Sequence, residues 1–231
     1  MPQLVLTRNQ SRRIDQVAIE ELGFNGLVLM ENAARGVVDR IRDRLGGRIV
    51  ILSGHGNNGG DGFAIARQLA AENHSSDIWL VNTGKQLSPD AAANLALLTA
   101  TGISVHTAVT EDQLQPLLSN LTASDLIIDA LLGTGVQGAV KSPHAEVIRA
   151  INNSAGFKVA VDVPSGLNCD TGTAEGPCVR AQRTITFVAQ KIGFRNFASR
   201  EFTGEVHVAH IGIPSSWIQQ WATNLTSPGS T

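Results

Sequence analysis

The sequence has no excess of charge of either sign. Its 20 acidic residues nearly balance 18 lysines and arginines, for a net charge of -2 at pH 7. No run of like charges and no basic face could neutralise a phosphate backbone, which argues against nucleic acid as a partner. With 42% hydrophobic and 16% charged residues, the chain can bury a sizeable core, and one domain over residues 1–231 is the simplest organisation.

Cysteine and long apolar stretches are also scarce. Cys169 and Cys178 are the two cysteines of the chain, with no CxxC motif and no nearby spaced histidines to build a zinc site. We expect two free thiols rather than a disulfide, as is usual in the cytosol. The start of the chain lacks the apolar core of a secretory signal, and no stretch approaches about 18 consecutive apolar residues. The expected location is cytoplasmic, with no membrane partner.

The spacing of apolar residues predicts an α/β fold. Helices are expected over residues 10–22 and 30–45, each followed by glycine. After them, β-branched runs alternate with helical stretches, which is typical of βαβ units around a parallel sheet. The expected strands are Arg48–Ser53, Asp77–Val81, Ser104–His106, Asp125–Ala130, Lys158–Val163, Arg183–Val188 and Glu205–Val208. The expected connecting helices lie near Gly62–Asn73, Ala91–Thr101, Glu111–Leu121 and Ala145–Asn153.

These elements predict a three-layer α/β/α sandwich with a Rossmann-like, mostly parallel sheet and two helices at the N-terminus. The two leading helices are amphipathic and offer more apolar surface than one face of the sandwich can cover, so we expect a homodimer. Residues 223–231 are polar, contain Pro228 and Gly229, and are expected to fray.

A glycine-rich segment follows the first expected strand directly. Residues 53–62 read Ser-Gly-His-Gly-Asn-Asn-Gly-Gly-Asp-Gly and lead into an apolar helix. A loop between a strand and a helix directs backbone N–H groups at a phosphate, and Gly54, Gly56 and Gly59 satisfy the dinucleotide-binding fingerprint. A tight turn without a ligand is the alternative interpretation.

Two features argue against the common enzymes that use such a loop. Asn82 stands at the end of the second strand, where a hydride-transferring Rossmann enzyme carries the acid that binds the ribose. No Gly-Lys-Ser/Thr of a P-loop follows the glycines. Asn57, Asn58 and Asp61 instead place polar side chains in the loop itself, which suggests that they coordinate or hydrogen-bond a ligand.

Two later strands end in an acid. Asp129 follows an apolar run and precedes a second glycine loop, and Asp162 lies between such a run and the turn Pro164-Ser165-Gly166. Open α/β sheets bind ligands at the carboxyl ends of their strands. An aspartate in so apolar a strand is costly to bury unless it is paired, bound to a cation or catalytic. A helix cap for Asp129 and a structural role for Asp162 are the alternatives.

Lys191 follows the strand expected over residues 183–188, so it can point over the same edge of the sheet. A lysine alone is most often a solvated surface group. Beside Asp162, a functional role becomes the better interpretation.

Together these motifs resemble the NAD(P)H-hydrate epimerase family, which has the YjeF N-terminal-type domain. The matching pieces follow the family's order over roughly residues 10–214 and are Met30–Ala33, Gly56–Gly62, Asp129–Gly135, Asp162–Leu167, Asp170–Gly172, Thr186-Phe187 with Lys191–Gly193, and Ile211–Pro214. The sequence departs from the family at Asn168, outside the core motifs, where an acid is often seen.

The resemblance implies an isomerase that interconverts the R and S forms of hydrated NADH and NADPH at C6 of the nicotinamide ring, a repair step for damaged nucleotides. It implies one potassium ion per subunit on Asn58, Asp129 and Ser165, whose oxygen donors suit a hard monovalent cation. The implied substrate-binding residues are Asn57, Asn58, Gly59, Gly60, Asp61, Gly133, Thr134, Gly135, Val136, Gln137, Gly138, Ala139 and Asp162.

Inversion at C6 requires proton transfer at an oxygen and stabilisation of a transient cation, by way of an iminium or a ring-opened intermediate. We assign this catalytic role to Asp162, with Lys191 as its partner. Because many family members carry a second domain and this chain ends soon after Pro214, we expect the ATP- or ADP-dependent dehydratase of the S epimer to be a separate protein.

Two other functions remain as alternatives. A non-catalytic nucleotide-binding or scaffold module of the same fold would be expected to lose its acidic site residues, whereas Asp61, Asp129 and Asp162 are all present. A nucleotide hydrolase would need a magnesium-binding cluster of acids, which the sequence does not offer.

Overall fold

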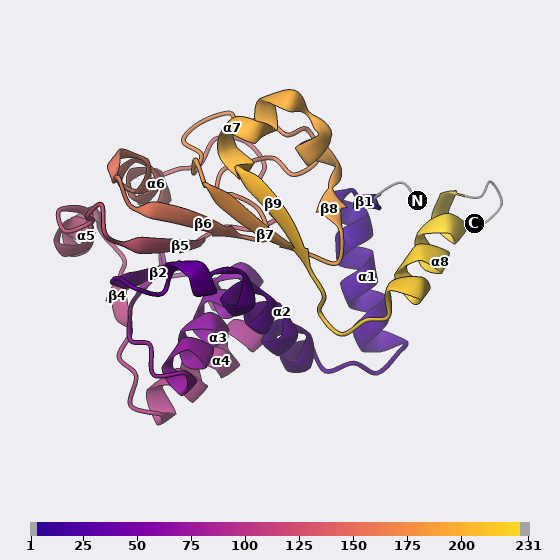
Figure 1. Ribbon diagram of the computed structural model, residues 1–231, viewed down its shortest axis with the longest axis horizontal. Coiled ribbons are helices and arrows are strands. Elements are labelled where there is room, and N and C mark those ends of the chain that lie inside the picture. Colours follow the sequence, from indigo (N-terminus) through magenta and orange to yellow (C-terminus); the bar gives the residue numbers. More distant parts are fainter. Residues whose placement is uncertain (1–3, 227–231) are drawn as a thin grey trace.

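A seven-stranded parallel sheet forms the centre of the computed structural model, which describes residues 4–226 (Figure 1). Its strand order is β4-β3-β2-β5-β6-β7-β9, and every neighbouring pair is parallel. The strands are β2 Ile49–Ser53, β3 Ser76–Val81, β4 His106–Ala108, β5 Leu126–Ala130, β6 Phe157–Val161, β7 Arg183–Phe187 and β9 Glu205–Ala209. A separate two-stranded parallel sheet pairs β1 Val5–Leu6 with β8 Gln190–Lys191.

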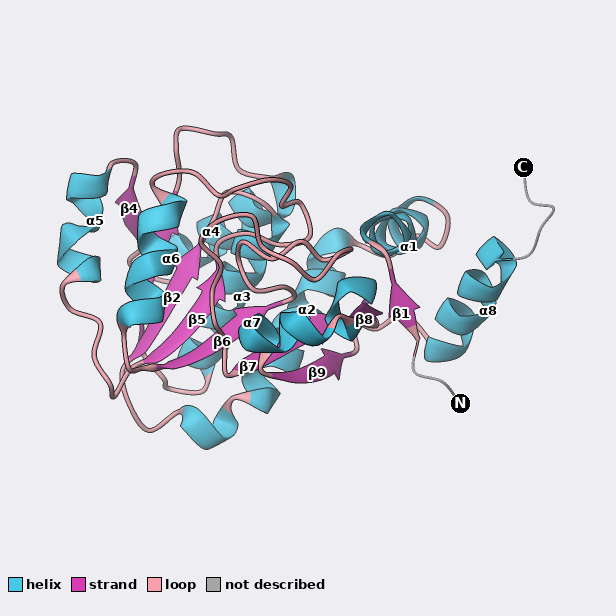
Figure 2. Ribbon diagram, turned by 90° about the horizontal axis from the view of Figure 1, so that it is seen from above, coloured by secondary structure: helices cyan, strands magenta, loops and turns pink. Residues whose placement is uncertain are grey.

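Helices cover both faces of the large sheet, which confirms the predicted three-layer α/β/α sandwich. One face carries α2 Gly26–Arg40, α3 Asn57–Ala71 and α4 Pro89–Ala100, and the other carries α5 Glu111–Leu118 and α6 His144–Asn153. The remaining helices are α1 Arg8–Glu20, α7 Arg200–Thr203 and α8 Ser215–Thr226, with 3-10 turns at Arg42–Arg44, Ile192–Arg195 and Phe197–Ser199. Seen from above, α1 and α8 lie on the opposite side of the molecule from α5 (Figure 2).

Strand β2 shows why the sheet is covered on both sides. Ile49 and Ile51 pack with α2, α3 and α4, whereas Val50 and Leu52 pack with α5 and α6. Successive side chains of a strand point to opposite faces, so a strand that is apolar throughout needs a helical layer on each face.

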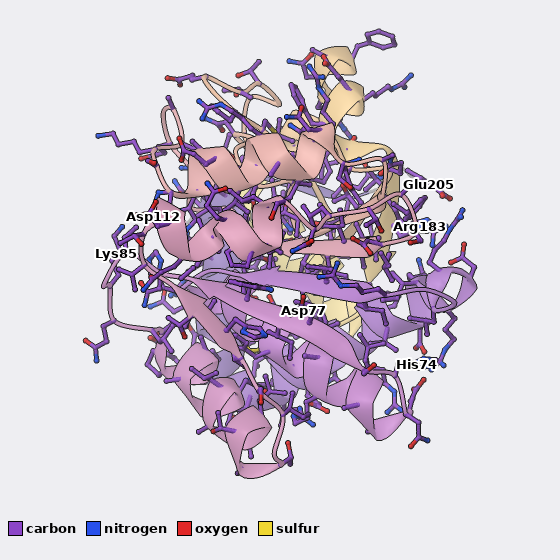
Figure 3. The ribbon with its side chains drawn as sticks, turned by 90° about the vertical axis from the view of Figure 1, so that its left-hand side faces the viewer. His74, Asp77, Lys85, Asp112, Arg183 and Glu205 are labelled. Carbon is purple, nitrogen blue, oxygen red and sulfur yellow. The ribbon has the colours of Figure 1, made fainter. Side chains whose placement is uncertain are left out.

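The carboxyl ends of the strands meet at one edge of the sheet. Figure 3 shows both edges: Lys85 and Asp112 follow β3 and β4 on one side, and His74, Arg183 and Glu205 mark the amino ends on the other. Strands β3 and β4 lie on one side of β2 within the sheet, whereas β5 and the strands after it lie on the other side of β2. The crevice between β2 and β5 is therefore the topological switch point, where such folds bind ligands.

The predicted strands are all present, with ends shifted by no more than two residues. Two helix predictions need correction. The helix expected near Gly62 begins at Asn57, and the helix expected over residues 30–45 spans Gly26–Arg40 because the side chain of Asn25 accepts a hydrogen bond from the N–H of Leu27 and caps it. The short elements β1, β8, α7 and α8 were not predicted.

The structure also bears on the predictions for the end of the chain and for the two cysteines. Residues 223–226, expected to fray, form the end of α8, and the rest of the predicted tail, 227–231, lies outside the described residues. Cys169 and Cys178 are buried free thiols, as predicted. Every helix between residues 4 and 226 is too short or too polar to cross a bilayer.

Candidate active site

The glycine-rich segment after β2 is mostly helical rather than a loop. Gly56 caps α3, and residues 57–61 begin its first turns. A Cβ atom on Gly59 would collide with the backbone of Gly54, and one on Gly54 would collide with the carbonyl oxygen of Leu131. Glycine at both positions therefore lets the helix start directly against the ends of β2 and β5, with the free N–H groups of its first turn at the switch point.

A cavity of about 140 Å³ opens at the carboxyl edge of the sheet. Its apolar wall includes Leu29, Met30, Ala33, Phe187 and Val188. Its polar lining consists of Ser11, Arg12, Asp15, Asn57, Asp61, Asp90, Thr134, Asp162 and Lys191. Eight separate parts of the sequence, including α1 and α2, thus contribute to one site.

Asp162 and Lys191 form an ion pair inside this cavity. The Nζ of Lys191 lies 2.7 Å from Oδ1 of Asp162, and the lysine side chain is only 2% exposed. Lys191 also donates to Oγ1 of Thr186 at 2.9 Å, and that hydroxyl donates to Oδ1 of Asp162 at 2.9 Å. The structure therefore confirms that the two predicted catalytic residues lie together, with Thr186 bridging them.

The backbone is strained on two sides of this pair. Asp162 follows the end of β6 with φ 63°, and Val188 follows β7 with φ 69°. The left-handed region is unfavourable for both, most of all for a β-branched residue, and costs on the order of 1–3 kcal/mol for each. Both residues line the cavity. Such strain tends to persist where the surrounding contacts serve a function.

Several carboxylates share the cavity with a single lysine. Burial raises the pKa of Asp61 well above its ordinary value, and the charges of Asp162, Asp15 and Asp90 raise it further. The pKa of Asp15 is raised to about 6, first by desolvation and then by the charge of Asp162, while Lys191 opposes the shift. The cavity thus holds carboxyl groups that keep their protons to a higher pH than usual, beside the cations of Lys191 and Arg12.

Asp15 is the main residue of the site that sequence reasoning missed. It lies on α1, is exposed at the mouth of the cavity, and has no motif around it. An acid on the polar face of an amphipathic helix resembles an ordinary solvent-facing residue. No local signal could have singled it out.

Asn58, Asp129 and Ser165 lie together beside the cavity, behind the first turn of α3. Asp129 is fully buried and accepts hydrogen bonds from the N–H of Ser165 at 2.8 Å and from the Ser165 hydroxyl. The side chain of Asn58 donates to the carbonyl of Leu132 at 3.1 Å, and its Oδ1 is buried without a hydrogen-bond partner. Burial raises the pKa of Asp129 to about 6, against the lowering effect of these hydrogen bonds.

This arrangement suits a cation with oxygen ligands. Within the described residues, Asp129 has hydrogen-bond donors but no ion pair, and the amide oxygen of Asn58 has no donor. Burying either group in this way is costly inside a protein. No group of three or more His, Cys, Asp or Glu side chains among residues 4–226 could hold a metal ion. A site here would therefore depend on amide and hydroxyl oxygens as well as on Asp129.

The predicted substrate-binding residues divide into two groups. Asn57, Asp61, Thr134 and Asp162 line the cavity, whereas Gly59 and Gly60 are buried within α3. The rest of the second glycine loop is not part of the cavity lining, and Arg8 of α1 holds it by donating to the carbonyl of Val136 at 2.8 Å. The loop members outside the cavity lining are Gly133, Gly135, Val136, Gln137, Gly138 and Ala139.

The chain is similar to proteins of one family. The model for the YjeF-related protein N-terminus matches residues 26–193. The NAD(P)H-hydrate epimerase of Rhodopirellula baltica is 38% identical over 218 residues, covering 94% of this chain and 88% of the relative. That of Pirellula staleyi is 36% identical over 219 residues, covering 94% and 96%.

A longer relative and a solved structure complete the comparison. The bifunctional NAD(P)H-hydrate repair enzyme Nnr of Moorella thermoacetica is 36% identical over 219 residues, which make up 93% of this chain and 41% of that protein. The crystal structure of yeast ynu0, YNL200c, has a TM-score of 0.72 with 20% identity, covering 90% of this chain and 87% of that one. At that identity the likeness concerns the fold.

The buried ion pair generates a first prediction. Lys191→Met should lower the free energy of unfolding by about 3–5 kcal/mol, because it leaves Asp162 unpaired beside Asp15 and Asp61. Adding Asp162→Asn should recover part of this loss. The measurement is urea denaturation.

The matched control is Arg180→Met, which breaks the exposed pair with Glu201, at 62% and 57% exposure, and should cost less than about 1 kcal/mol. If Lys191→Met were as stable as this control, the pair would not hold the site together.

Proposed function

Because this chain belongs to the family of the YjeF-related protein N-terminus, we propose that it is an NAD(P)H-hydrate epimerase, an isomerase that interconverts the R and S forms of hydrated NADH and NADPH. The observation that carries this proposal is the Asp162–Lys191 pair in a small cavity at the carboxyl edge of the sheet. The reaction repairs a damaged nucleotide and involves no net redox change.

The size of the cavity supports placing the nicotinamide end of the substrate there. Its volume of about 140 Å³ suits a single ring, whereas sites for larger ligands occupy several hundred Å³. We place the ring between the apolar wall and Asp162. The phosphates then extend toward the first turn of α3 and residues 133–139, where helix N–H groups and the guanidinium of Arg12 offer donors.

We propose that inversion proceeds by elimination and addition of water. A proton passes to the C6 hydroxyl, the C6–O bond breaks with its electrons on oxygen, and the N1 lone pair forms an N1=C6 double bond. Water then adds to C6 on the other face and loses a proton. The intermediate is a cation, which a neighbouring carboxylate such as that of Asp162 stabilises, whereas the ring-opened alternative is neutral and gains nothing from it.

Asp162 is the proposed acid–base group in this scheme. Lys191 and Thr186 fix the position of its Oδ1, so its other oxygen is left to face the substrate. The pairing also holds the carboxyl group close to the ring, where the positive charge develops.

Asp162→Asn tests this assignment, since it keeps the size of the side chain and removes its ability to accept a proton. Epimerisation should fall by about 10²-fold or more, while ligand binding survives. The measurement is chromatography of the two epimers over time, starting from pure R, after subtraction of the rate without protein.

Asp112→Asn, an exposed change on α5, is the control and should keep the wild-type rate. An Asp162→Asn variant with the wild-type rate would remove Asp162 from the mechanism. A wild-type protein that binds hydrated NADH without equilibrating its epimers would favour the non-catalytic binding module.

We also propose one potassium ion per subunit, held by Asn58, Asp129 and Ser165. The unpartnered Oδ1 of Asn58 and the buried carboxylate of Asp129 support this assignment, and oxygen donors with one charge suit a monovalent cation. When bound, the ion supplies fixed positive charge between the start of α3 and residues 131–139. Its role is to order these segments rather than to take part in bond breaking.

Potassium binding should therefore stabilise the fold. Replacing tetramethylammonium chloride by potassium chloride at equal ionic strength should raise the free energy of unfolding by about 1.4 kcal/mol when potassium is ten times its Kd. This corresponds to a rise in Tm of about 3–5 °C. Asp129→Asn should lose the increment, and Asp112→Asn should keep it. Equal Tm values in the two salts would contradict the proposed site.

We further propose a homodimer. Large apolar side chains are exposed around the connection between α1 and α2, with Ile19 and Leu22 each 43% and Val28 50% exposed. Contact with a second copy would remove them from water. Light scattering at micromolar concentration should give the mass of two chains. Val28→Ser should weaken the association, and Val109→Ser, equally exposed after β4, should not; a single-chain mass for the wild type would refute the dimer.

The cellular setting completes the proposal. The free thiols of Cys169 and Cys178 support a cytoplasmic location, where cysteines stay reduced. We expect the S epimer to be consumed by an ATP- or ADP-dependent dehydratase.

A further inference from the structure

Helix α1 presents one face to the cavity. Ser11, Asp15 and Ile19, spaced four residues apart, line it together with Arg12, while Ile14 and Ala18 pack into a hydrophobic cluster on the other side of the helix. The spacing of four places Asp15 in the middle of the face that looks into the site.

The position of α1 relative to Lys191 is fixed by several contacts. The strand before the helix, β1, pairs with β8, so that Leu6 is the direct partner of Lys191. The N–H of Arg8 donates to Oδ1 of Asp170 at 2.7 Å, and a capping box at Thr7 and Gln10 begins the helix. Asp15 lies two helical turns into α1. The strand before this helix pairs with β8, which carries Lys191, so the position of Asp15 relative to Lys191 is fixed.

Asp15 and Asp162 reach the cavity from different elements of the fold. Asp162 comes from the carboxyl end of β6 in the sheet, and Asp15 comes from a helix outside the sheet. Within the described residues no hydrogen bond joins the two carboxylates. Both residues line the cavity, which leaves space for a ring between them.

The chemistry of inversion requires two proton transfers on opposite faces of C6. The hydroxyl that leaves takes a proton on one face, and the water that adds gives up a proton on the other. A single carboxylate can serve one face only while the ring stays bound. Asp162 alone would return water to the face from which it left.

We propose that Asp15 is a second catalytic residue, which transfers the proton on the face of the ring opposite to Asp162. This inference rests on the proposed epimerase function. In one direction Asp15 protonates the leaving hydroxyl and Asp162 takes the proton of the incoming water. In the other direction the two residues exchange roles. Each turnover begins with one carboxyl protonated and the other charged and ends with these states reversed, and proton exchange with water restores the starting state.

The other charged groups that face Asp15 do not fit this role. Arg12 cannot release its proton near neutral pH, and Lys191 is committed to Asp162 and Thr186. Asp61 is 8% exposed, and burial holds its proton tightly, so it is suited to donate a hydrogen bond rather than to accept a proton. Asp90 belongs to the first turn of α4, and its carboxylate lies against Gly26.

The acidity of Asp15 is compatible with both roles. Its pKa of about 6 follows from desolvation and from the charge of Asp162, with Lys191 opposing. The carboxyl group therefore gains and loses a proton close to neutral pH, as an acid–base catalyst must.

The test compares inversion with oxygen exchange. Wild type and Asp15→Asn are each given pure R and pure S hydrated NADH in water enriched in oxygen-18, and chromatography with mass spectrometry follows both epimers and their label. In Asp15→Asn, inversion should fall by about 10²-fold. Label should still enter the one epimer whose hydroxyl faces Asp162, because that residue can remove and return water on a single face.

Glu20→Gln is the matched control, because it makes the same change of charge on α1 at an exposed residue outside the cavity lining. It should behave as the wild type. Unchanged inversion in Asp15→Asn would overturn the proposal, and so would a parallel loss of inversion and exchange, which indicates a merely structural role. A wild type that does not invert either epimer would instead contradict the epimerase function.

Discussion

The buried ion pair of Lys191 and Asp162 is the interaction on which the rest of the site depends. Lys191 is almost completely removed from water, and a buried ammonium group is tolerable only with a charged partner and further acceptors. Asp162 and the Thr186 hydroxyl supply them. The left-handed backbone at Asp162 and Val188 lies beside this pair, and such strain persists only where stronger interactions determine the local structure.

The cavity combines this pair with further carboxyl groups. Lys191 and Arg12 share the cavity with Asp15, Asp61 and Asp162. Burial raises the pKa of Asp61, and desolvation together with the charge of Asp162 raises that of Asp15. Such a site stabilises a cation and also keeps protonated and ionised carboxyl groups side by side. Both properties are needed for proton transfer around an iminium intermediate, which connects the electrostatics of the cavity to the proposed reaction.

The sequence located much of the site because parallel strands bring their carboxyl ends to one edge. Asp129, Asp162 and the glycine segment each follow an apolar run, and the structure places them at neighbouring strands β5, β6 and β2. Sequence reasoning erred where packing decided the backbone. Five glycines suggested a loop over residues 54–62, yet close contact with β2 and β5 lets the helix start at Asn57.

The sequence by itself determined the parallel α/β architecture and the order of the motifs, because the periodicity of apolar residues is a local property that survives without knowledge of the fold. Only the tertiary structure decided which residues complete the cavity. Asp15 reaches it because Leu6 pairs with Lys191 and Arg8 binds Asp170, 162 positions away in the chain. Contacts over such separations depend on how whole elements pack, so no pattern around Asp15 could reveal them.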